Sequence, residues 1–162
     1  MHKQPGLLDL KTFNLIVRHT PLISIDLIIL NEENKVMLGW RKNQPAKNHW
    51  FVPGGRILKN ETIYHAFERI AYSELGISLM FSQAEFMGVY EHIHRTENFS
   101  GDEGYGTHYI VLAFRVRISG TGNDFPVDQH SSYQWFTIQD LLLDPLVHGY
   151  AKNYFNETLP VR

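Results

Sequence analysis

The first residue that points to chemistry is Glu74, near the end of a predicted helix. The segment from Glu61 to Leu75 carries an apolar stripe at helical spacing, formed by Ile63, Ala66, Phe67, Ile70 and Ala71. Because Glu74 follows Ile70 by four residues and Ala71 by three, its carboxylate continues this inward-facing stripe. An inward carboxylate is costly unless it is paired or bound to a cation. The competing interpretation is a partly exposed helix-end glutamate, or one paired with a nearby arginine.

The loop before this helix suits contact with phosphate. Gly54 and Gly55 let the backbone approach a ligand closely, and Arg56 follows them directly. A guanidinium fork matches the oxygens of a diphosphate. A hard divalent cation could bridge such a diphosphate and the Glu74 carboxylate.

Loop and helix together resemble the signature of the Nudix family. Six positions match at the right spacing: Gly55, Glu61, Arg69, Glu74, Gly76 and Ile77. Two acidic positions of the signature are lost, since Ile70 and Ser73 occupy them. Typical members use these carboxylates to gather several cations for attack at phosphorus, so that chemistry looks impaired here. The chain is then either a non-catalytic binding module or a variant that works with one metal ion.

Longer stretches favour the second alternative, because they resemble the GDP-mannose mannosyl hydrolases, which share the reduced signature. These stretches are PLISIDLII, WFVPGGRI, AFERIAYSELG, ENFSGDEGYGTHYIVLAF and DQHSSYQWF. The resemblance implies an α+β Nudix fold, an α/β/α sandwich with a mixed sheet. It implies hydrolysis of GDP-mannose, or GDP-glucose, to GDP and free sugar by water attack at the anomeric carbon with inversion. It also implies one Mg²⁺ per subunit, replaceable by Mn²⁺, and a homodimer.

The resemblance assigns the metal ligands and the base. The Glu74 carboxylate, the Gly54 carbonyl and the Gln129 side chain match the family's ligands, and oxygen donors suit Mg²⁺. His130 matches the base that deprotonates water, in a loop expected to close over the substrate. Taken without the resemblance, Gln129 is a solvated loop amide and His130 is one of nine histidines.

Six further side chains are assigned to the substrate. Arg56 and Arg41 match groups that stabilise the leaving diphosphate, with Tyr109 as a hydroxyl donor. Asp26 matches a position near the sugar phosphate, and His92 matches one near the sugar. Phe13 could stack on guanine. The alternatives are a solvated Arg41, core packing for Tyr109 and Phe13, and a buried structural pair for Asp26.

The elements expected to position these residues mix helices and strands without regular βαβ alternation. Strands are predicted at Leu22–Leu30, Val36–Trp40, Glu85–His94, Thr107–Ile118 and Tyr133–Phe136. Helices are predicted at Leu7–Val17, from Asn60 as cap to a stop at Gly76, at Thr137–Leu143 and at Val147–Phe155. Polar loops are expected at Arg41–His49, Arg95–Gly106 and Gly120–Ser132, and a sharp loop at Pro53–Gly55.

Composition narrows the functional classes. The formal net charge of −2 gives no bulk attraction to nucleic acid, and the absence of cysteine excludes disulfides and thiolate chemistry. No signal-peptide pattern or apolar stretch of membrane-spanning length is present, so we expect a cytoplasmic protein without a membrane partner. The 162 residues fit one domain spanning 1–162. Conventional P–O hydrolysis and non-catalytic binding of a nucleotide sugar remain the alternatives.

Overall fold

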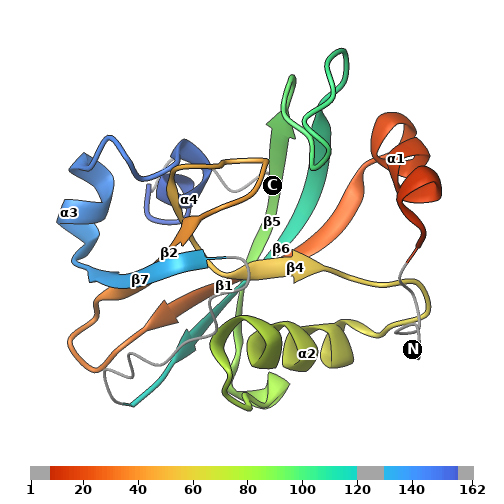
Figure 1. Ribbon diagram of the computed structural model, residues 1–162. Coiled ribbons are helices and arrows are strands. Elements are labelled where there is room, and N and C mark those ends of the chain that lie inside the picture. The colour runs from red at the N-terminus through yellow and green to blue at the C-terminus, as the bar shows by residue number, and fades with distance from the viewer. Residues whose placement is uncertain (1–7, 120–129, 157–162) are drawn as a thin grey trace.

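The computed structural model describes residues 8–119 and 130–156 (Figure 1). Its strands are β1 (Leu22–Leu30), β2 (Val36–Arg41), β3 (Trp50–Phe51), β4 (Gly54–Arg56), β5 (Glu85–His94), β6 (Thr107–Arg117) and β7 (His130–Phe136). Its helices are α1 (Leu10–His19), α2 (Ile63–Leu75), the 3₁₀ turn η1 (Phe81–Gln83), α3 (Ile138–Leu143) and α4 (Gly149–Asn153). Most of the strands predicted from the pattern of apolar residues are confirmed.

The described strands form one mixed sheet with β1 at its centre. The strand order is β3-β2-β1-β6-β5, while β4 pairs with β1 and β7 pairs with β2. β1 runs parallel to β6 along its whole length and antiparallel to β4 and β2. On one edge of β1, Ser24–Asp26 pairs with β4, whereas Leu30 pairs with β2. The sheet therefore divides on this side of β1 into two separate strand pairings.

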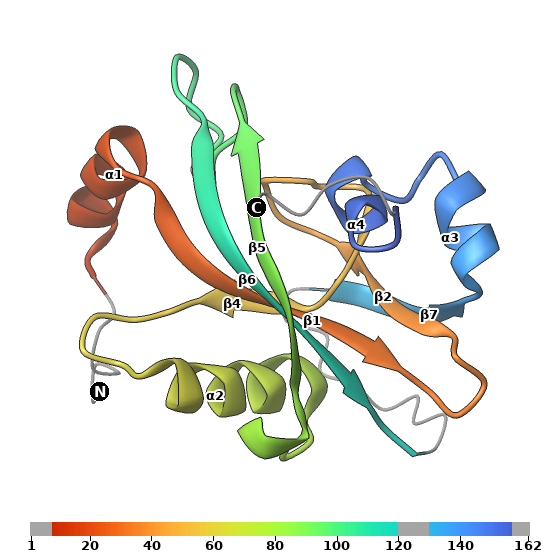
Figure 2. The same ribbon diagram turned by 180° about the vertical axis from the view of Figure 1, so that it is seen from behind.

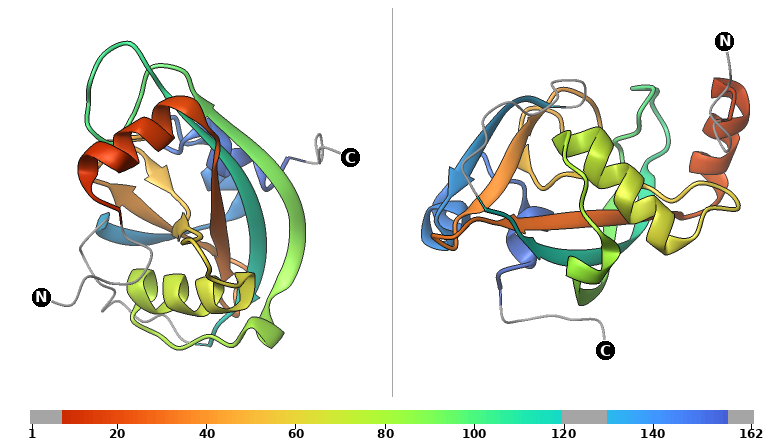
Figure 3. Two further views of the ribbon diagram at one scale, coloured as in Figure 1. Left: turned by 90° about the vertical axis from the view of Figure 1, so that its right-hand side faces the viewer. Right: turned by 90° about the horizontal axis from the view of Figure 1, so that it is seen from below.

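Helices cover both faces of this sheet, which confirms the α/β/α Nudix fold (Figures 2 and 3). Successive β1 side chains alternate between two apolar cores, as the pleat requires. Ile25, Leu27 and Ile29 pack with α2, whereas Ile28 and Leu30 pack in the core that includes residues of α3 and α4. A strand buried on both faces needs a nearly continuous apolar sequence, which explains LISIDLIIL.

The start of α2 differs from the prediction by two residues. Asn60 does not cap the helix, since its backbone is left-handed with φ of 65°. Thr62 is the cap, and its hydroxyl accepts a hydrogen bond from the amide of His65 at 3.2 Å. The predicted stop at Gly76 is confirmed, because Gly76 adopts φ of 67°, a conformation that glycine enters without strain.

Two predicted loops are wrong in part. Residues 54–56 form β4, because the backbone pairs with β1 through contacts such as Leu27 N to Pro53 O at 2.8 Å. His130–Ser132 belong to β7, which pairs along β2, and the rest of the expected Gly120–Ser132 loop lies outside the described residues. Neither of these segments, GGR and HSS, shows the alternation of apolar and polar residues on which the prediction relied.

The other helices differ from prediction at their ends. α1 begins at Leu10, where the Asp9 side chain accepts a hydrogen bond from Thr12 N at 3.0 Å. α4 covers only Gly149–Asn153 of the expected Val147–Phe155. None of the described helices is long and apolar enough to cross a membrane.

Candidate functional site

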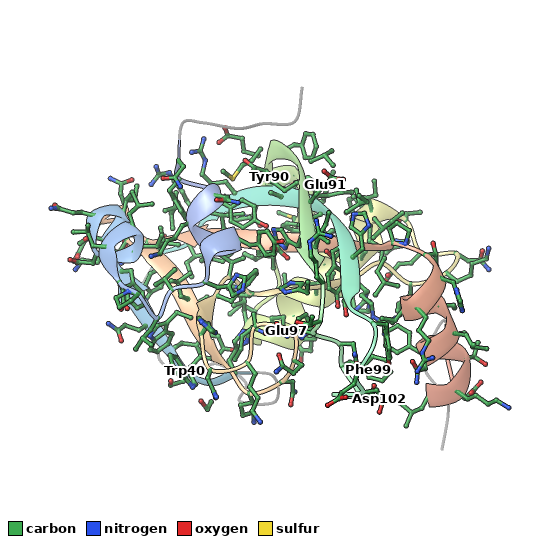
Figure 4. All side chains as sticks on the ribbon, turned by 90° about the horizontal axis from the view of Figure 1, so that it is seen from above. Trp40, Tyr90, Glu91, Glu97, Phe99 and Asp102 are labelled. Atoms are coloured by element: carbon green, nitrogen blue, oxygen red, sulfur yellow. The ribbon has the colours of Figure 1, made fainter. Side chains whose placement is uncertain are left out.

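A pocket of about 310 Å³ lies where β1, β4, β5 and β6 meet the loop after β2 and the helix α1. Seven residues assigned from the sequence line it: Phe13, Asp26, Arg41, Gly54, Arg56, His92 and Tyr109. They come from six separate elements, so the fold alone brings them together. Phe99 also lines the pocket, from the loop between β5 and β6, where Glu97 and Phe99 are labelled in Figure 4.

The sequence analysis missed the contribution of that loop. Glu97 accepts a hydrogen bond from Ala46 N at 3.0 Å, which ties the β5–β6 loop to the loop after β2. The Phe99 ring lies 4.6 Å from the Phe13 ring and also lines the pocket. The guanidinium of Arg56 lies 3.9 Å from the centre of the Phe13 ring. In the described structure, Phe13 therefore packs against Arg56 and Phe99, with part of its surface exposed.

The cationic part of the pocket consists of Arg41 and Arg56. Arg41 is oriented by a hydrogen bond from its Nε to the carbonyl of Pro45 at 3.1 Å. Burial lowers the pKa of Arg56 from its ordinary value, which is so high that the group stays charged at neutral pH. Burial raises the pKa of the Tyr109 phenol, so that it remains a protonated donor beside the two arginines. Such a set can bind the oxygens of a diphosphate.

Asp26 is the acidic group of the pocket, and it is 6% exposed. Burial raises its pKa to about 7, against the opposing effects of a hydrogen bond from Tyr154 and the charge of Arg41. The Tyr154 hydroxyl donates to Asp26 Oδ2 at 2.6 Å. Gly54 must be glycine at this point, because a Cβ there would lie 2.5 Å from Asp26 Oδ1. Asp26 thus has the buried partner required of it, and it also reaches the pocket.

His92 also lines the pocket and is 4% exposed. Burial, reinforced by the neighbouring His94 and His148, lowers its pKa to about 3. Its ring stacks on Tyr150 with centroids 4.4 Å apart and an interplanar angle of 11°. The neutral ring is therefore held in one plane at the edge of the pocket.

Glu74 and His130 form a buried pair that does not line the described pocket. Glu74 Oε2 lies 3.4 Å from His130 Nδ1, and the two side chains are 4% and 0% exposed. Among the described residues, neither Glu74 Oε2 nor His130 Nε2 has a hydrogen-bond partner. Tyr133 donates to the Glu74 carbonyl at 2.9 Å and holds the helix end beside β7. His130 is thus a strand residue packed over Gly39, and its expected place in a loop is wrong.

The two altered positions of the signature have different environments. Ile70 is buried and packs against Gly55, whose added Cβ would lie 3.1 Å from Ile70 Cγ1. Ser73 is exposed, and its hydroxyl donates to the Ile70 carbonyl. Neither side chain adds a charged oxygen beside Glu74. Glu61 and Arg69 instead form a two-pronged ion pair at 2.6 and 2.8 Å, and Arg69 also donates to the Arg56 carbonyl.

The Glu74 carboxylate is a candidate ligand for a hard cation. The described residues contain no cluster of three or more acidic, histidine or cysteine side chains suited to a metal. They do contain a buried carboxylate oxygen without a partner, at Glu74. Pro53 and Ile57, which flank β4, form hydrogen bonds with β1. The carbonyl of Gly54 therefore faces away from β1, as does that of Arg56, to which Arg69 donates. Gln129 lies outside the described residues.

Comparison with protein families identifies the class. The family model described as NUDIX domain matches residues 20–156, and the chain belongs to this family. It is 37% identical over 135 residues to the low-salt glycan biosynthesis protein Agl8 of Haloferax volcanii, with 83% of each chain covered. It is 31% identical over 112 residues to an ADP-ribose pyrophosphatase of Methanocaldococcus jannaschii, covering 69% of this chain and 59% of that protein.

Solved structures agree on the fold. A MutT Nudix hydrolase from Burkholderia pseudomallei matches with a TM-score of 0.67 and 22% identity, over 87% of this chain and all of that one. The Nudix domain of Shewanella oneidensis NrtR, solved with ADP ribose, matches with a TM-score of 0.61 and 17% identity, over 91% of each chain. At these identities, the likeness establishes the architecture of a Nudix hydrolase fold.

Proposed function

We propose that this Nudix hydrolase cleaves GDP-mannose, or GDP-glucose, to GDP and free sugar by attack of water at the anomeric carbon. One observation carries the proposal. The helix that normally supplies several acidic ligands here offers the single buried carboxylate of Glu74, with His130 3.4 Å away. One carboxylate suits one ion that stabilises a departing diphosphate, rather than several ions that activate water at phosphorus.

The pocket residues divide the work along the substrate. Arg56 and Arg41 bind the diphosphate and offset the negative charge that grows on it as the glycosidic bond breaks. The neutral Tyr109 phenol donates a hydrogen bond to the same group. Asp26 and His92, which both line the pocket and both contact Tyr154, hold the sugar and its phosphate junction. Phe13, with Phe99 beside it, offers an aromatic surface on which the guanine ring can stack.

Glu74, the Gly54 carbonyl and Gln129 would hold one Mg²⁺ per subunit, with Mn²⁺ as a substitute. When bound, the ion supplies positive charge to the leaving diphosphate. His130 is assigned the role of base by the resemblance to the GDP-mannose mannosyl hydrolases, and its Nε2 makes no hydrogen bond within the described residues. The proposal includes a homodimer, as in the enzymes that the chain resembles.

Two relatives support a nucleoside diphosphate linked to a sugar as the substrate class. Agl8 is described as a glycan biosynthesis protein, and glycan synthesis consumes activated sugars. The ADP-ribose pyrophosphatase favours a second candidate, P–O cleavage of a similar nucleotide. The loss of acidic side chains at Ile70 and Ser73 argues against that second candidate. A non-catalytic nucleotide-sugar module is the third, and retention of both Glu74 and His130 argues against it.

Hydrolysis in ¹⁸O-labelled water separates these candidates. The purified protein is incubated with GDP-mannose and Mg²⁺, and the products are followed by ¹H NMR and mass spectrometry. We expect GDP and mannose, with the label in the sugar and the configuration at C1 inverted in the first product. Label in GDP, or release of GMP and a sugar phosphate, excludes C–O cleavage. Tight binding of GDP-mannose without products supports the non-catalytic module.

A further inference from the structure

A buried tyrosine that the sequence analysis did not single out joins two residues of the pocket. The Tyr154 hydroxyl lies 2.6 Å from Asp26 Oδ2 and 3.2 Å from His92 Nε2. All three side chains are buried, with 4–6% of each exposed. Asp26 and His92 line the pocket, whereas Tyr154 does not belong to its described lining. An effect of Tyr154 on a ligand must therefore pass through its two partners.

The donors and acceptors of this trio allow one consistent arrangement once Asp26 is ionised. Burial and the neighbouring Asp26 raise the pKa of Tyr154 well above its ordinary value, so the phenol keeps its proton. A phenol has a single proton to donate, and the ionised carboxylate can only accept it. The phenol oxygen is then left as an acceptor toward His92. His92 can satisfy it only by carrying its own proton on Nε2.

Among the described residues, no other hydrogen bond to the His92 ring makes this choice. Stacking on Tyr150 fixes the plane of the ring but forms no hydrogen bond with either nitrogen. The lowered pKa of His92, about 3, keeps the ring neutral at neutral pH. Two tautomers remain, and the hydrogen bond made by one nitrogen decides which is populated.

We propose that Tyr154 is a positioning residue, which holds His92 as its Nε2–H tautomer and fixes the orientation of the Asp26 carboxylate at the pocket. Nδ1 of His92 is then the acceptor that the ring offers to a hydroxyl-bearing ligand. Asp26 keeps Oδ1 for other partners, because Oδ2 is engaged by the phenol. The kinetic consequence rests on the proposed function, in which both side chains hold the sugar end of the substrate.

The tautomer is tested without any substrate. Long-range ¹H–¹⁵N NMR spectra at pH 8 report which nitrogen of His92 carries the proton. Tyr154→Phe removes only the hydroxyl. Tyr90→Phe is the matched control, because its ring packs 4.7 Å from that of Tyr154 in the same core. We expect the Nε2–H form in the wild type and in Tyr90→Phe, and a shift toward Nδ1–H in Tyr154→Phe.

The wild-type spectrum alone can overturn the proposal, since a proton on Nδ1 contradicts it whatever the variants do. An unchanged tautomer in a folded Tyr154→Phe protein also overturns it. With GDP-mannose as substrate, we expect Tyr154→Phe to lower kcat about tenfold with a smaller change in KM, and Tyr90→Phe to change neither. An unchanged kcat contradicts the positioning role. If the wild type does not hydrolyse GDP-mannose, the proposed function fails, while the NMR result still decides the role of Tyr154.

Discussion

At the residue scale, Glu74 shows a conflict between stability and binding. Its carboxylate is 4% exposed, and Oε2 has no hydrogen-bond partner among the described residues. A buried carboxylate oxygen without a donor lowers the stability of the folded chain. The same oxygen has a lone pair that accepts no hydrogen bond, and a cation requires such a lone pair from its ligand. A buried carboxylate that served folding alone would accept hydrogen bonds from its neighbours. The absence of such a bond at Glu74 Oε2 within the described residues therefore favours a role in binding.

Glu74→Gln separates these roles. We expect the variant to lose Mn²⁺ binding, measured by titration calorimetry, and to lose turnover of GDP-mannose. Without metal, we expect it to unfold at or above the wild-type temperature, because the substitution removes a buried charge while nearly keeping the volume. Glu68→Gln, on the same helix, is the control and should bind Mn²⁺ normally. Retained Mn²⁺ affinity, or a melting temperature several degrees lower, would make Glu74 a structural residue.

At the element scale, the pairing of β2 with β7 places His130. The two strands pair from Val36–Phe136 to Gly39–Tyr133, and the register shifts before Arg41 meets His130. This shift lets the His130 ring lie over Gly39, where a Cβ would come within 2.4 Å of the ring. Gly39 thus makes room for the side chain proposed as the base, and the bulge aims it at Glu74.

Gly39→Ala tests this placement. We expect a loss of about 1–3 kcal/mol in the free energy of unfolding, measured with urea, because the ring must move out of a packed core. Turnover of GDP-mannose should fall at the same time. Gly149→Ala is the control, since an added Cβ there meets nothing within 4 Å. In a double-mutant cycle, His130→Ala should cancel most of the Gly39→Ala loss. Simple additivity of the two losses contradicts the contact.

At the scale of the whole molecule, the histidines gathered around the pocket make stability depend on pH. Burial lowers the pKa of His92 to about 3 and that of His148 to about 4, below their ordinary value near 6.5. Unfolding therefore takes up protons, and the stability contributed by these groups is lost as pH falls below about 6.5. Asp26 acts in the opposite sense, because its raised pKa of about 7 makes the folded state take up a proton.

Burial also lowers the pKa of His94, so three histidines act against the single carboxyl, and the net uptake on unfolding is at least about one proton as pH falls from 6.5 to 5. We expect the free energy of unfolding to fall by roughly 1.4 kcal/mol per pH unit in that range. Urea unfolding at a series of pH values measures the slope. His92→Gln should flatten it, whereas the exposed His19→Gln should leave it unchanged. A slope that His92→Gln does not alter means that another group causes the acid sensitivity.

Local pattern predicted much of this molecule correctly. The apolar run LISIDLIIL marked β1 to the residue, the helical stripe placed Glu74 on the buried face of α2, and Gly76 ended that helix. These features depend on periodicity and backbone preference, which a short window of sequence contains. The helix cap was misplaced because Asn60 and Thr62 are both favourable caps. Asn60 instead adopts a left-handed backbone in the turn before the helix, where the Glu61 side chain accepts a hydrogen bond from the amide of Leu58.

The sequence alone therefore determined the strands and the helix that carries Glu74. It also showed that two acidic side chains of the signature are absent. The convergence of side chains came from the packing of the whole sheet. Tyr154 lies 128 residues from Asp26 along the chain and 2.6 Å from it in space. His130 reaches Glu74 because β7 pairs along β2 with one shift in register. No local window contains such pairs, since they follow from strand order and from the burial of two opposing cores.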